Sequence, residues 1–272
     1  MQRLARRCAV VGHPAAHSLT PALYQAAFAE LGLDWKCDAI DVPASGLPDF
    51  VAGLGPEWAG LAVTMPHKPA AAELGRPDQL VRRLGVANTI VFGADGPQAY
   101  NTDVAGFVQA LAYRRFDDVA DAVLLGAGAT ARAALLALDH LGVSAITAQV
   151  RDVTRADQLA ALAADLGVTL AVEPLGTAHE TDLLISTLPG DAAGQWSEGA
   201  VAMAQSIFDA SYNPWPTPLT VAAVDAGRPV ATGLDLLAGQ AVFQLDLIVG
   251  DTVDFELLYR AGKQQLARQW HD

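Results

Sequence analysis

Cysteine, lysine and long apolar runs are all scarce in this sequence of 272 residues. Its two cysteines, Cys8 and Cys37, form no CxxC motif and belong to no cluster of histidines and cysteines. This pattern argues against a disulfide framework or a zinc site and predicts two reduced thiols. No stretch has the roughly 18 apolar residues of a membrane span, and the apolar run before His13 is too short for a secretory signal. We therefore expect a cytoplasmic protein without a metal ion.

Positive charge is in short supply as well. Lys and Arg together number 17 against 30 Asp and Glu, so the formal net charge is −13. Nucleic acid needs a clustered basic surface, so this balance argues against such a partner, although a few local donors can still bind a small anionic substrate. Lysine occurs only as Lys36, Lys68 and Lys263, which makes each lysine a candidate functional residue. Nothing marks an interface, so monomer and homodimer both stay open.

What the sequence does contain is a repeated alternation of short apolar strands and helices. In the first part, strands are expected at 8–12, 35–42, 60–64 and 88–92, and helices at 21–31, 47–54, 69–74 and 78–84. After a helix at 104–115, the pattern restarts with strands at 121–125, 146–151, 182–186 and 206–210, helices at 131–141 and 154–166, and closing helices at 238–249 and 253–269. This order predicts an α/β protein of two domains with a boundary near residue 104. Thr20 is the expected N-cap of the first helix.

A glycine-rich turn, residues 126–131 (GAGATA), joins a predicted strand to a predicted helix. Gly126 permits a tight turn, and Gly128 lets a pyrophosphate approach the backbone. The helix N-terminus then offers N–H groups and the positive end of its dipole to the phosphates. The sequence therefore predicts a dinucleotide site here, with a tight turn that binds nothing as the alternative.

The residues after the second strand of this domain select the cofactor. A carboxylate there suits the ribose 2′-OH of NAD(H), whereas arginine suits the 2′-phosphate of NADP(H). The sequence offers Arg151, Asp152 and Arg155 at this point. Two guanidinium groups favour NADP(H), while Asp152 keeps NAD(H) open, and the two arginines as ordinary surface charges are the other alternative.

Polar side chains follow predicted strands of the first domain, and ligands of open α/β sheets bind at such strand ends. Ser18 and Thr20 lie just before a helix and suit a carboxylate, with helix capping by Thr20 as the alternative. Lys68 follows the strand at 60–64 and, when partly desolvated, can pass a proton to a hydroxyl or carbonyl oxygen. A solvated surface charge is the alternative for Lys68.

Asn88 and Asp103 complete this candidate site. Asp103 beside Lys68 would pair with the ammonium group, orient it and hold a substrate hydroxyl, and the amide of Asn88 would add a donor. A Lys–Asp pair of this kind facing a nicotinamide is a competent site for proton transfer. The sequence by itself does not show that these side chains converge.

Seven segments in order along the whole chain resemble the shikimate dehydrogenase family. They read GHPAAHSLTP, GLAVTMPHKPAA, GVANTI, YNTDVAGF, GAGATAR, DASYNPWPTPL and GLDLLAGQA. The resemblance implies a substrate-binding catalytic domain of residues 1–104 and 237–272, with a Rossmann-type NADP-binding domain of residues 105–236 inserted into it. It also implies reversible reduction of the C3 ketone of 3-dehydroshikimate to shikimate by NADPH, a step of aromatic amino acid biosynthesis.

The resemblance also implies a role for each matching position. Lys68 is the implied catalytic acid and base, with Asp103 as its partner at the reacting hydroxyl. The implied substrate contacts are Ser18, Thr20, Thr64, Asn88, Asp103, Tyr212 and Gln240. The implied cofactor contacts are Gly126, Ala127, Gly128, Ala129, Thr130, Arg151, Asp152, Arg155, Thr187 and Gly233.

Three positions depart from the family pattern. Thr20 stands where the family usually has serine, as in the branch that also oxidises quinate. Val150-Arg151-Asp152 replaces the usual Asn-Arg-Thr, so a carboxylate stands near the expected 2′-phosphate and weakens the preference for NADP(H). Ala129 replaces a glycine of the turn, which is tolerated as long as its φ stays negative.

Three other functions stay open beside this expectation. Thr20 and Asp152 favour an NAD-dependent quinate/shikimate dehydrogenase, which the two nearby arginines oppose. A non-catalytic shikimate-binding protein on the same scaffold would not need both Lys68 and Asp103. A methylene-tetrahydrofolate dehydrogenase-like enzyme does not suit the HSLTP and NTD segments.

Overall fold

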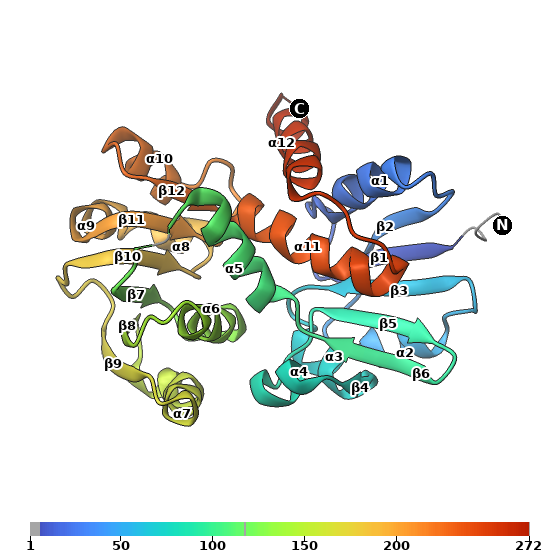
Figure 1. Cartoon of the computed structure of the whole chain (residues 1–272), viewed down its shortest axis with the longest axis horizontal. Coiled ribbons are helices and arrows are strands. Elements are labelled where there is room, and N and C mark those ends of the chain that lie inside the picture. Colours follow the sequence, from blue (N-terminus) through green and yellow to red (C-terminus); the bar gives the residue numbers. More distant parts are fainter. Residues whose placement is uncertain (1–5, 117, 272) are drawn as a thin grey trace. The chain divides into compact units, whose positions relative to one another are not determined.

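The chain folds into two compact units, each built on a six-stranded sheet (Figure 1). The computed structural model describes residues 6–116 and 118–271. Met1–Thr102 and Leu237–Asp272 make up what we call the first unit, and Asp103–Leu236 make up the second unit. Helices and strands alternate along both units, which confirms the α/β class expected from the sequence.

The first unit is a mixed sheet with helices packed on it. Its strand order is β2-β1-β3-β5-β6-β4. The strands are β1 (Arg7–Gly12), β2 (Lys36–Asp41), β3 (Trp58–Val63), β4 (Arg76–Pro77), β5 (Thr89–Gly93) and β6 (Gly96–Tyr100). The helices are α1 (Thr20–Glu30), α2 (Leu47–Ala52), α3 (Lys68–Leu74), α4 (Gln79–Leu84), α12 (Phe255–His271) and most of α11 (Gly233–Val249). A Cβ on Gly60 would lie 2.7 Å from Cγ1 of Ile248, so α11 packs directly on β3.

One strand of this sheet reverses direction. β5 runs antiparallel to both β3 and β6, so the strand–helix alternation expected here is interrupted by a hairpin. Asp95-Gly96 lies at the hairpin turn with a φ of +93° at Gly96, and this dipeptide is typical of such turns. Because of the reversal, the start of β5 lies beside the end of β3, where the N–H of Val63 donates to the carbonyl of Asn88 at 2.7 Å.

The second unit is built on a parallel sheet with the order β12-β11-β10-β7-β8-β9. Its strands are β7 (Asp121–Leu125), β8 (Ala145–Val150), β9 (Thr169–Pro174), β10 (Thr181–Ser186), β11 (Ala204–Asp209) and β12 (Val230–Thr232). Its helices are α5 (Asp103–Arg114), α6 (Ala129–His140), α7 (Asp157–Leu166), α8 (Gly190–Gly194), α9 (Ser197–Met203), α10 (Pro218–Asp225) and the 3₁₀ helix η1 (Val153–Ala156). This strand order is the doubly wound arrangement of dinucleotide-binding domains and confirms the expected Rossmann-type fold.

Several elements of the second unit do not follow from the sequence pattern, namely β9, β12, α8, α9 and α10. β12 has three residues and α8 has five, which is too short for a periodic apolar signal. β9 is an edge strand without a fully buried residue, so its apolar pattern is weak. Short or half-exposed elements depend on their neighbours for stability, which the local sequence does not record.

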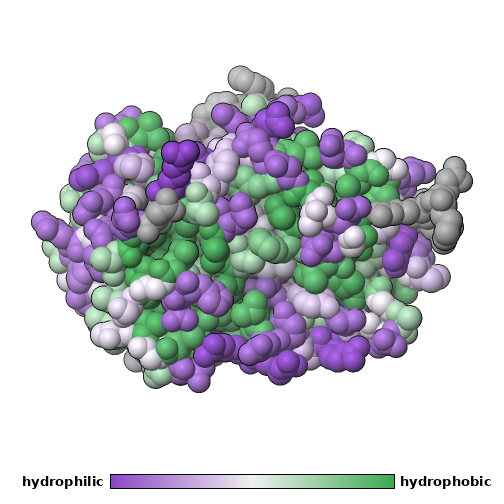
Figure 2. Space-filling view, viewed as in Figure 1, coloured by the Kyte–Doolittle hydropathy of each residue, from purple (hydrophilic) through white to green (hydrophobic). Residues whose placement is uncertain are grey.

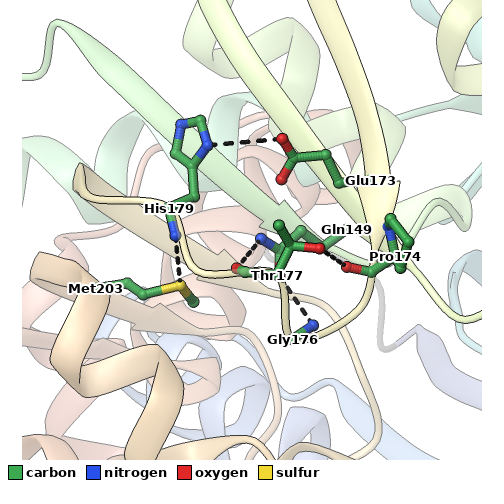
Figure 3. Close-up of polar contacts among 7 residues, drawn as sticks. All are labelled: Gln149, Glu173, Pro174, Gly176, Thr177, His179 and Met203. Atoms are coloured by element: carbon green, nitrogen blue, oxygen red, sulfur yellow. Dashed lines mark hydrogen bonds and ion pairs between the residues drawn. The ribbon is translucent and has the colours of Figure 1, made fainter.

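The connection from β9 to β10 contains no helix and is held by a buried glutamine (Figure 3). Gln149 on β8 is fully buried. Its Nε2 donates to the carbonyl of Thr177 at 2.8 Å, and its Oε1 accepts from the N–H of Gly176 at 3.2 Å. The N–H of His179 reaches the sulfur of Met203 in α9 at 3.1 Å. These bonds satisfy backbone groups that a crossover helix would otherwise have paired.

Six large apolar side chains among the described residues are exposed, namely Met65, Tyr113, Leu141, Val153, Val221 and Val224. Figure 2 shows hydrophilic residues around the rim of the visible face, with hydrophobic residues between them. Met65 and Val224 are the most exposed of the large apolar side chains, at 61% and 59%. Within residues 6–116 and 118–271, every helix is too short or too polar to cross a membrane.

Candidate active site

The polar residues expected at the substrate site gather along one edge of the first sheet. Thr64 follows β3, Asn88 precedes the reversed β5, and Thr102 follows β6. The N–H of Asn88 donates to the carbonyl of Tyr100 at 3.0 Å, and that of Thr64 donates to Val11 at 2.9 Å. Strand pairing therefore brings these segments to the same edge, although they lie far apart in the sequence.

Ser18 and Thr20 contact each other before and at the start of α1. The Oγ of Ser18 lies 3.2 Å from Oγ1 of Thr20 and accepts a hydrogen bond from the N–H of Thr20 at 3.3 Å. The expected capping by Thr20 is wrong, because the helix begins at Thr20 and its N-cap is Leu19, without a side-chain cap. The hydroxyl of Thr20 is thus not used in a cap, and the two hydroxyls form a compact polar pair.

Asp41, at the end of β2, holds the loop that carries this pair. Its Oδ1 lies 2.6 Å from Nδ1 of His13, and its Oδ2 accepts the N–H of Ala15 at 3.1 Å. The hydrogen bond with His13 is the main reason that the pKa of Asp41 lies below its usual value. The carbonyl of Ala15 in turn accepts the N–H of Ser18 at 3.0 Å, so Asp41 supports the turn that leads to Ser18.

Lys68 and Asp103 both have titratable side chains and are almost entirely buried. Lys68 begins α3 in the first unit and is 8% exposed, and Asp103 begins α5 in the second unit and is 2% exposed. Before Lys68, the buried His67 donates from Nε2 to the carbonyl of Val42 at 2.8 Å, which makes it part of the wall beside α3. The pairing of Lys68 with Asp103 stays a prediction.

A buried hydrogen-bond network connects Asn88 to α11. Nδ2 of Asn88 donates to Oε1 of Gln240 at 2.8 Å and to Oγ1 of Thr102 at 2.9 Å. Oδ1 of Asn88 accepts the N–H of Thr102 at 2.8 Å. Gln244, one helical turn after Gln240, donates to the carbonyl of Asn88 at 3.1 Å. Two predicted substrate contacts, Asn88 and Gln240, therefore lie in direct contact.

A cavity of about 590 Å³ opens at the glycine-rich turn of the second unit. The residues that line it are Gly126, Ala127, Gly128, Val150, Arg151, Thr154, Arg155, Asp157, Gln158, Thr187 and Leu188. Six of the expected cofactor residues thus share one cavity, whereas Ala129 and Thr130 form the first turn of α6 behind it.

The geometry of the turn itself leaves space for a ligand. Gly126 has a φ of +106°, and a Cβ there would lie 2.6 Å from Oγ1 of Thr187. At Gly128, by contrast, a Cβ would meet no atom within 4 Å, and this residue is the N-cap of α6 without a side-chain cap. Ala129 is helical with a negative φ, so the alanine is tolerated as expected.

Of the charged residues after β8, the two arginines line the cavity, whereas the aspartate is hydrogen-bonded to a neighbouring threonine. Arg151 and Arg155 line the cavity, but Asp152 does not. Oδ1 of Asp152 accepts both the N–H and the hydroxyl of Thr154, at 3.1 and 2.7 Å, and the hydrogen bond from that hydroxyl is the main reason that its pKa is lowered. The carboxylate caps η1, which reduces its expected conflict with a phosphate in the cavity.

These residues fit the phosphates of NADP(H). The uncapped start of α6 offers N–H groups beside the open space at Gly128, and two guanidinium groups supply the charge that a 2′-phosphate needs. No cluster of three or more His, Cys, Asp or Glu suited to a metal ion occurs in the part of the chain that the structure describes.

Tyr212 and Gly233, the remaining expected contacts, both lie in the second unit near the end of β11. Tyr212 is half-buried in the loop after β11. A Cβ on Gly233 would lie 2.6 Å from the carbonyl oxygen of Ala210, so α11 starts in close contact with that loop. Buried Asp209 anchors the loop, since its carboxylate accepts the hydroxyl of Thr217 at 2.5 Å.

The sequence reasoning missed several residues that belong to these sites. Thr102 and Gln244 hold Asn88, and Thr154 and Gln158 line the cavity. Gln244 had a usable signal, because a second glutamine four residues after Gln240 lies on the same side of an apolar helix. Thr154 had a weaker signal in its position between the two arginines.

Known proteins match the chain over nearly its whole length. Residues 10–90 match the family model described as the shikimate dehydrogenase substrate binding domain. The shikimate dehydrogenase (NADP(+)) of Methanopyrus kandleri is 32% identical and covers 94% of this chain and 94% of its own. The chain belongs to the shikimate dehydrogenase family.

Solved structures of this family share the fold. The shikimate dehydrogenase of Mycobacterium tuberculosis is 36% identical, with a TM-score of 0.88 over 96% of this chain and 99% of its own. The shikimate 5-dehydrogenase of Thermus thermophilus, solved in complex with NADP(H) and shikimate, is 31% identical, with a TM-score of 0.80 over 95% of this chain and 99% of its own.

Proposed function

We propose that the protein is an NADP-dependent shikimate dehydrogenase, which reversibly reduces the C3 ketone of 3-dehydroshikimate to shikimate in aromatic amino acid biosynthesis. The observation that carries the proposal is the family relationship, which spans 94% of the chain. The polar edge of the first sheet and the cavity at the glycine-rich turn support it independently. We place the reaction in the cytoplasm, in line with the two free cysteines.

Substrate binding is assigned mainly to residues 1–104 and 237–272, with Tyr212 of the second unit as a further contact. The paired hydroxyls of Ser18 and Thr20 receive the substrate carboxylate. The ring hydroxyls bind Asn88, Asp103 and Gln240, while Thr64 and Tyr212 supply further contacts. A buried site of this kind makes each hydrogen bond to the substrate stronger than in water.

The chemical step needs a proton at the oxygen on C3. Lys68 donates this proton as negative charge develops on that oxygen, and it takes the proton back in the reverse direction. Asp103 pairs with Lys68 and holds the reacting hydroxyl. NADPH, when bound, supplies the hydride. The near-complete burial of Lys68 and Asp103 excludes water from the proton transfer.

Cofactor binding is assigned to residues 105–236. The turn at 126–128 and the first turn of α6 bind the pyrophosphate, with Thr187 closing the cavity beside Gly126. Arg151 and Arg155 bind the 2′-phosphate.

An NAD-dependent quinate/shikimate dehydrogenase is the second candidate. Thr20, which replaces the usual serine at the carboxylate end, favours it. The position of the Asp152 carboxylate, bonded to Thr154, argues against a role for Asp152 at the ribose of NAD(H).

Steady-state assays test the proposal. Shikimate and quinate are each oxidised with NADP⁺ and with NAD⁺, and shikimate binding is measured in parallel by calorimetry. The expected result is the highest kcat/KM with shikimate and NADP⁺. Higher kcat/KM with quinate and NAD⁺ would support the second candidate. Binding of shikimate without turnover in either cofactor would instead indicate a non-catalytic binding protein.

A further inference from the structure

Gln244 is a buried polar side chain of α11, one helical turn after Gln240. It is 2% exposed, although glutamine is rarely buried without a specific partner. Its Nε2 donates to the carbonyl of Asn88 and to Oγ1 of Thr89, each at 3.1 Å. Its Oε1 accepts the hydroxyl of Tyr24 at 3.0 Å. All of its polar atoms are therefore paired within the first unit.

The bonds of Gln244 have a defined direction. Tyr24 has no exposed surface, and burial raises its pKa well above the usual value, so its hydroxyl remains a donor. Since Oε1 of Gln244 accepts that hydrogen, its amide nitrogen is turned toward Asn88 and Thr89. Oγ1 of Thr89 accepts from Gln244 and can donate its own hydrogen to Oδ1 of Asn88, which lies 3.0 Å away.

The same order of donors and acceptors continues from Thr89 through Asn88 to Gln240. With its Oδ1 accepting from Thr89 and from the N–H of Thr102, the amide of Asn88 must turn Nδ2 toward Oε1 of Gln240, at 2.8 Å. Because Oε1 of Gln240 is occupied in this way, its two N–H groups are what it offers to a ligand. The series Tyr24, Gln244, Thr89, Asn88 and Gln240 thus donates in one direction throughout.

We propose that Gln244 is a positioning residue for the substrate, which fixes the amide orientations of Asn88 and Gln240 so that Gln240 donates to a substrate oxygen. This inference rests on the proposed function, since it assumes that Gln240 contacts the substrate. Without Gln244, the hydroxyl of Thr89 is no longer directed toward Oδ1 of Asn88, so the orientation of the Asn88 amide rests on the N–H of Thr102 alone. Gln240 then more often presents an acceptor to an oxygen that needs a donor. The expected loss is that of about one neutral hydrogen bond, or roughly three- to tenfold in affinity.

The experiment is a double-mutant cycle on KM for shikimate. Gln244→Leu keeps the side-chain volume and removes both amide groups, and Gln240→Ala removes the residue through which it acts. We expect Gln244→Leu to raise KM for shikimate about three- to tenfold and to leave KM for NADP⁺ unchanged. In the Gln240→Ala background, the same substitution should change KM by less than about twofold, because the bond it positions is already absent.

Matched variants separate positioning from folding. Gln264→Leu replaces an exposed glutamine of α12 and should leave KM unchanged. Tyr24→Phe removes only the hydroxyl that orients Gln244, so it should also raise KM for shikimate. If Gln244→Leu fails to fold, Tyr24→Phe takes its place in the cycle. Equal effects of the substitution with and without Gln240 would overturn the proposal, as would an unchanged KM in Gln244→Leu. Absence of shikimate turnover by the unaltered enzyme would contradict the proposed function instead.

Discussion

Among single residues, the candidate site stands out by two titratable side chains that are almost entirely buried. Lys68 and Asp103 are 8% and 2% exposed. Burial of an ionised group costs several kcal/mol unless a partner compensates it, so such residues serve chemistry more often than stability. Lysine and aspartate are usually exposed in folded proteins, so the burial of these two residues could not be expected from their residue types.

Replacement of Lys68 tests its role in proton transfer. We expect Lys68→Ala to lower kcat by about 10²- to 10⁴-fold, because a general acid in the transition state contributes about that much. KM for shikimate should change little. Initial rates over a range of shikimate concentrations measure both constants, with the exposed Lys263→Ala as the control. A normal kcat with an increased KM would remove Lys68 from the chemistry.

Replacement of Arg151 tests cofactor recognition. Arg151 lines the cavity and carries a charge suited to a 2′-phosphate, which NAD⁺ lacks. We expect Arg151→Ala to raise KM for NADP⁺ about tenfold or more, since a charge-assisted hydrogen bond contributes about 1.5–3 kcal/mol. KM for NAD⁺ should stay within about twofold of the original value. Similar losses with both cofactors would indicate that Arg151 supports the cavity wall rather than the phosphate.

At the scale of elements, the turn between β7 and α6 contains two glycines with different tasks. Gly126 has a positive φ and contacts Thr187, so its lack of a side chain serves the fold. Gly128 has ordinary backbone angles and a Cβ there would meet no atom within 4 Å, so the fold itself does not require a glycine at this position. The sequence motif is the same for both, and only the environment separates them.

Alanine at Gly126 should therefore change the stability of the protein, whereas alanine at Gly128 should change the KM for NADP⁺. Gly126→Ala should lower the free energy of unfolding by about 1–3 kcal/mol, because of the strained φ and the contact with Thr187. Gly128→Ala should leave the melting temperature nearly unchanged and raise KM for NADP⁺ at least severalfold, since its Cβ enters the pyrophosphate space. Thermal unfolding and steady-state kinetics of both variants measure this. A destabilised Gly128→Ala protein with normal KM would contradict it.

Elements with strong periodic patterns were predictable, and elements defined by their neighbours were not. The glycine-rich turn lies where the sequence places it, and α6 (Ala129–His140) begins two residues before the predicted helix at 131–141. The reversal of β5 and the edge strand β9 depend on pairing with other strands, for which the local residues carry weak signals. The dipeptide Asp95-Gly96 is typical of a hairpin turn, but the sequence analysis did not use it.

At the scale of the whole molecule, one buried carboxyl links stability to pH. Asp209 has no exposed surface, and burial raises its pKa to about 6 despite hydrogen bonds from Thr217 and Ser211. The folded protein therefore binds this proton more tightly than the unfolded chain, whose value is 3.8. Stability from this group is present below the unfolded pKa and is lost as the pH rises from about 3.8 to 6.

Asp209→Asn should remove this dependence. The loss in the original protein is about 3 kcal/mol between roughly pH 3 and pH 7, because each pKa unit corresponds to about 1.4 kcal/mol. The variant should accordingly gain stability relative to the original protein as the pH rises through this range. Melting temperatures of both proteins between pH 4 and pH 7.5 measure the difference. A difference that does not vary with pH would show that Asp209 does not titrate in the folded state over this range.

The alternation of strands and helices, the glycine-rich turn and the family could be inferred from the chain alone, because neighbouring residues or ordered motifs encode each of them. Which side chains meet became visible only in the folded protein. Gln244 and Asn88 are 156 positions apart, yet they share a hydrogen bond. The Asp152 carboxylate is hydrogen-bonded to Thr154 and does not line the cavity. The physical reason is that hydrogen-bond partners are chosen by strand register and helix packing, which arise from the folded chain as a whole.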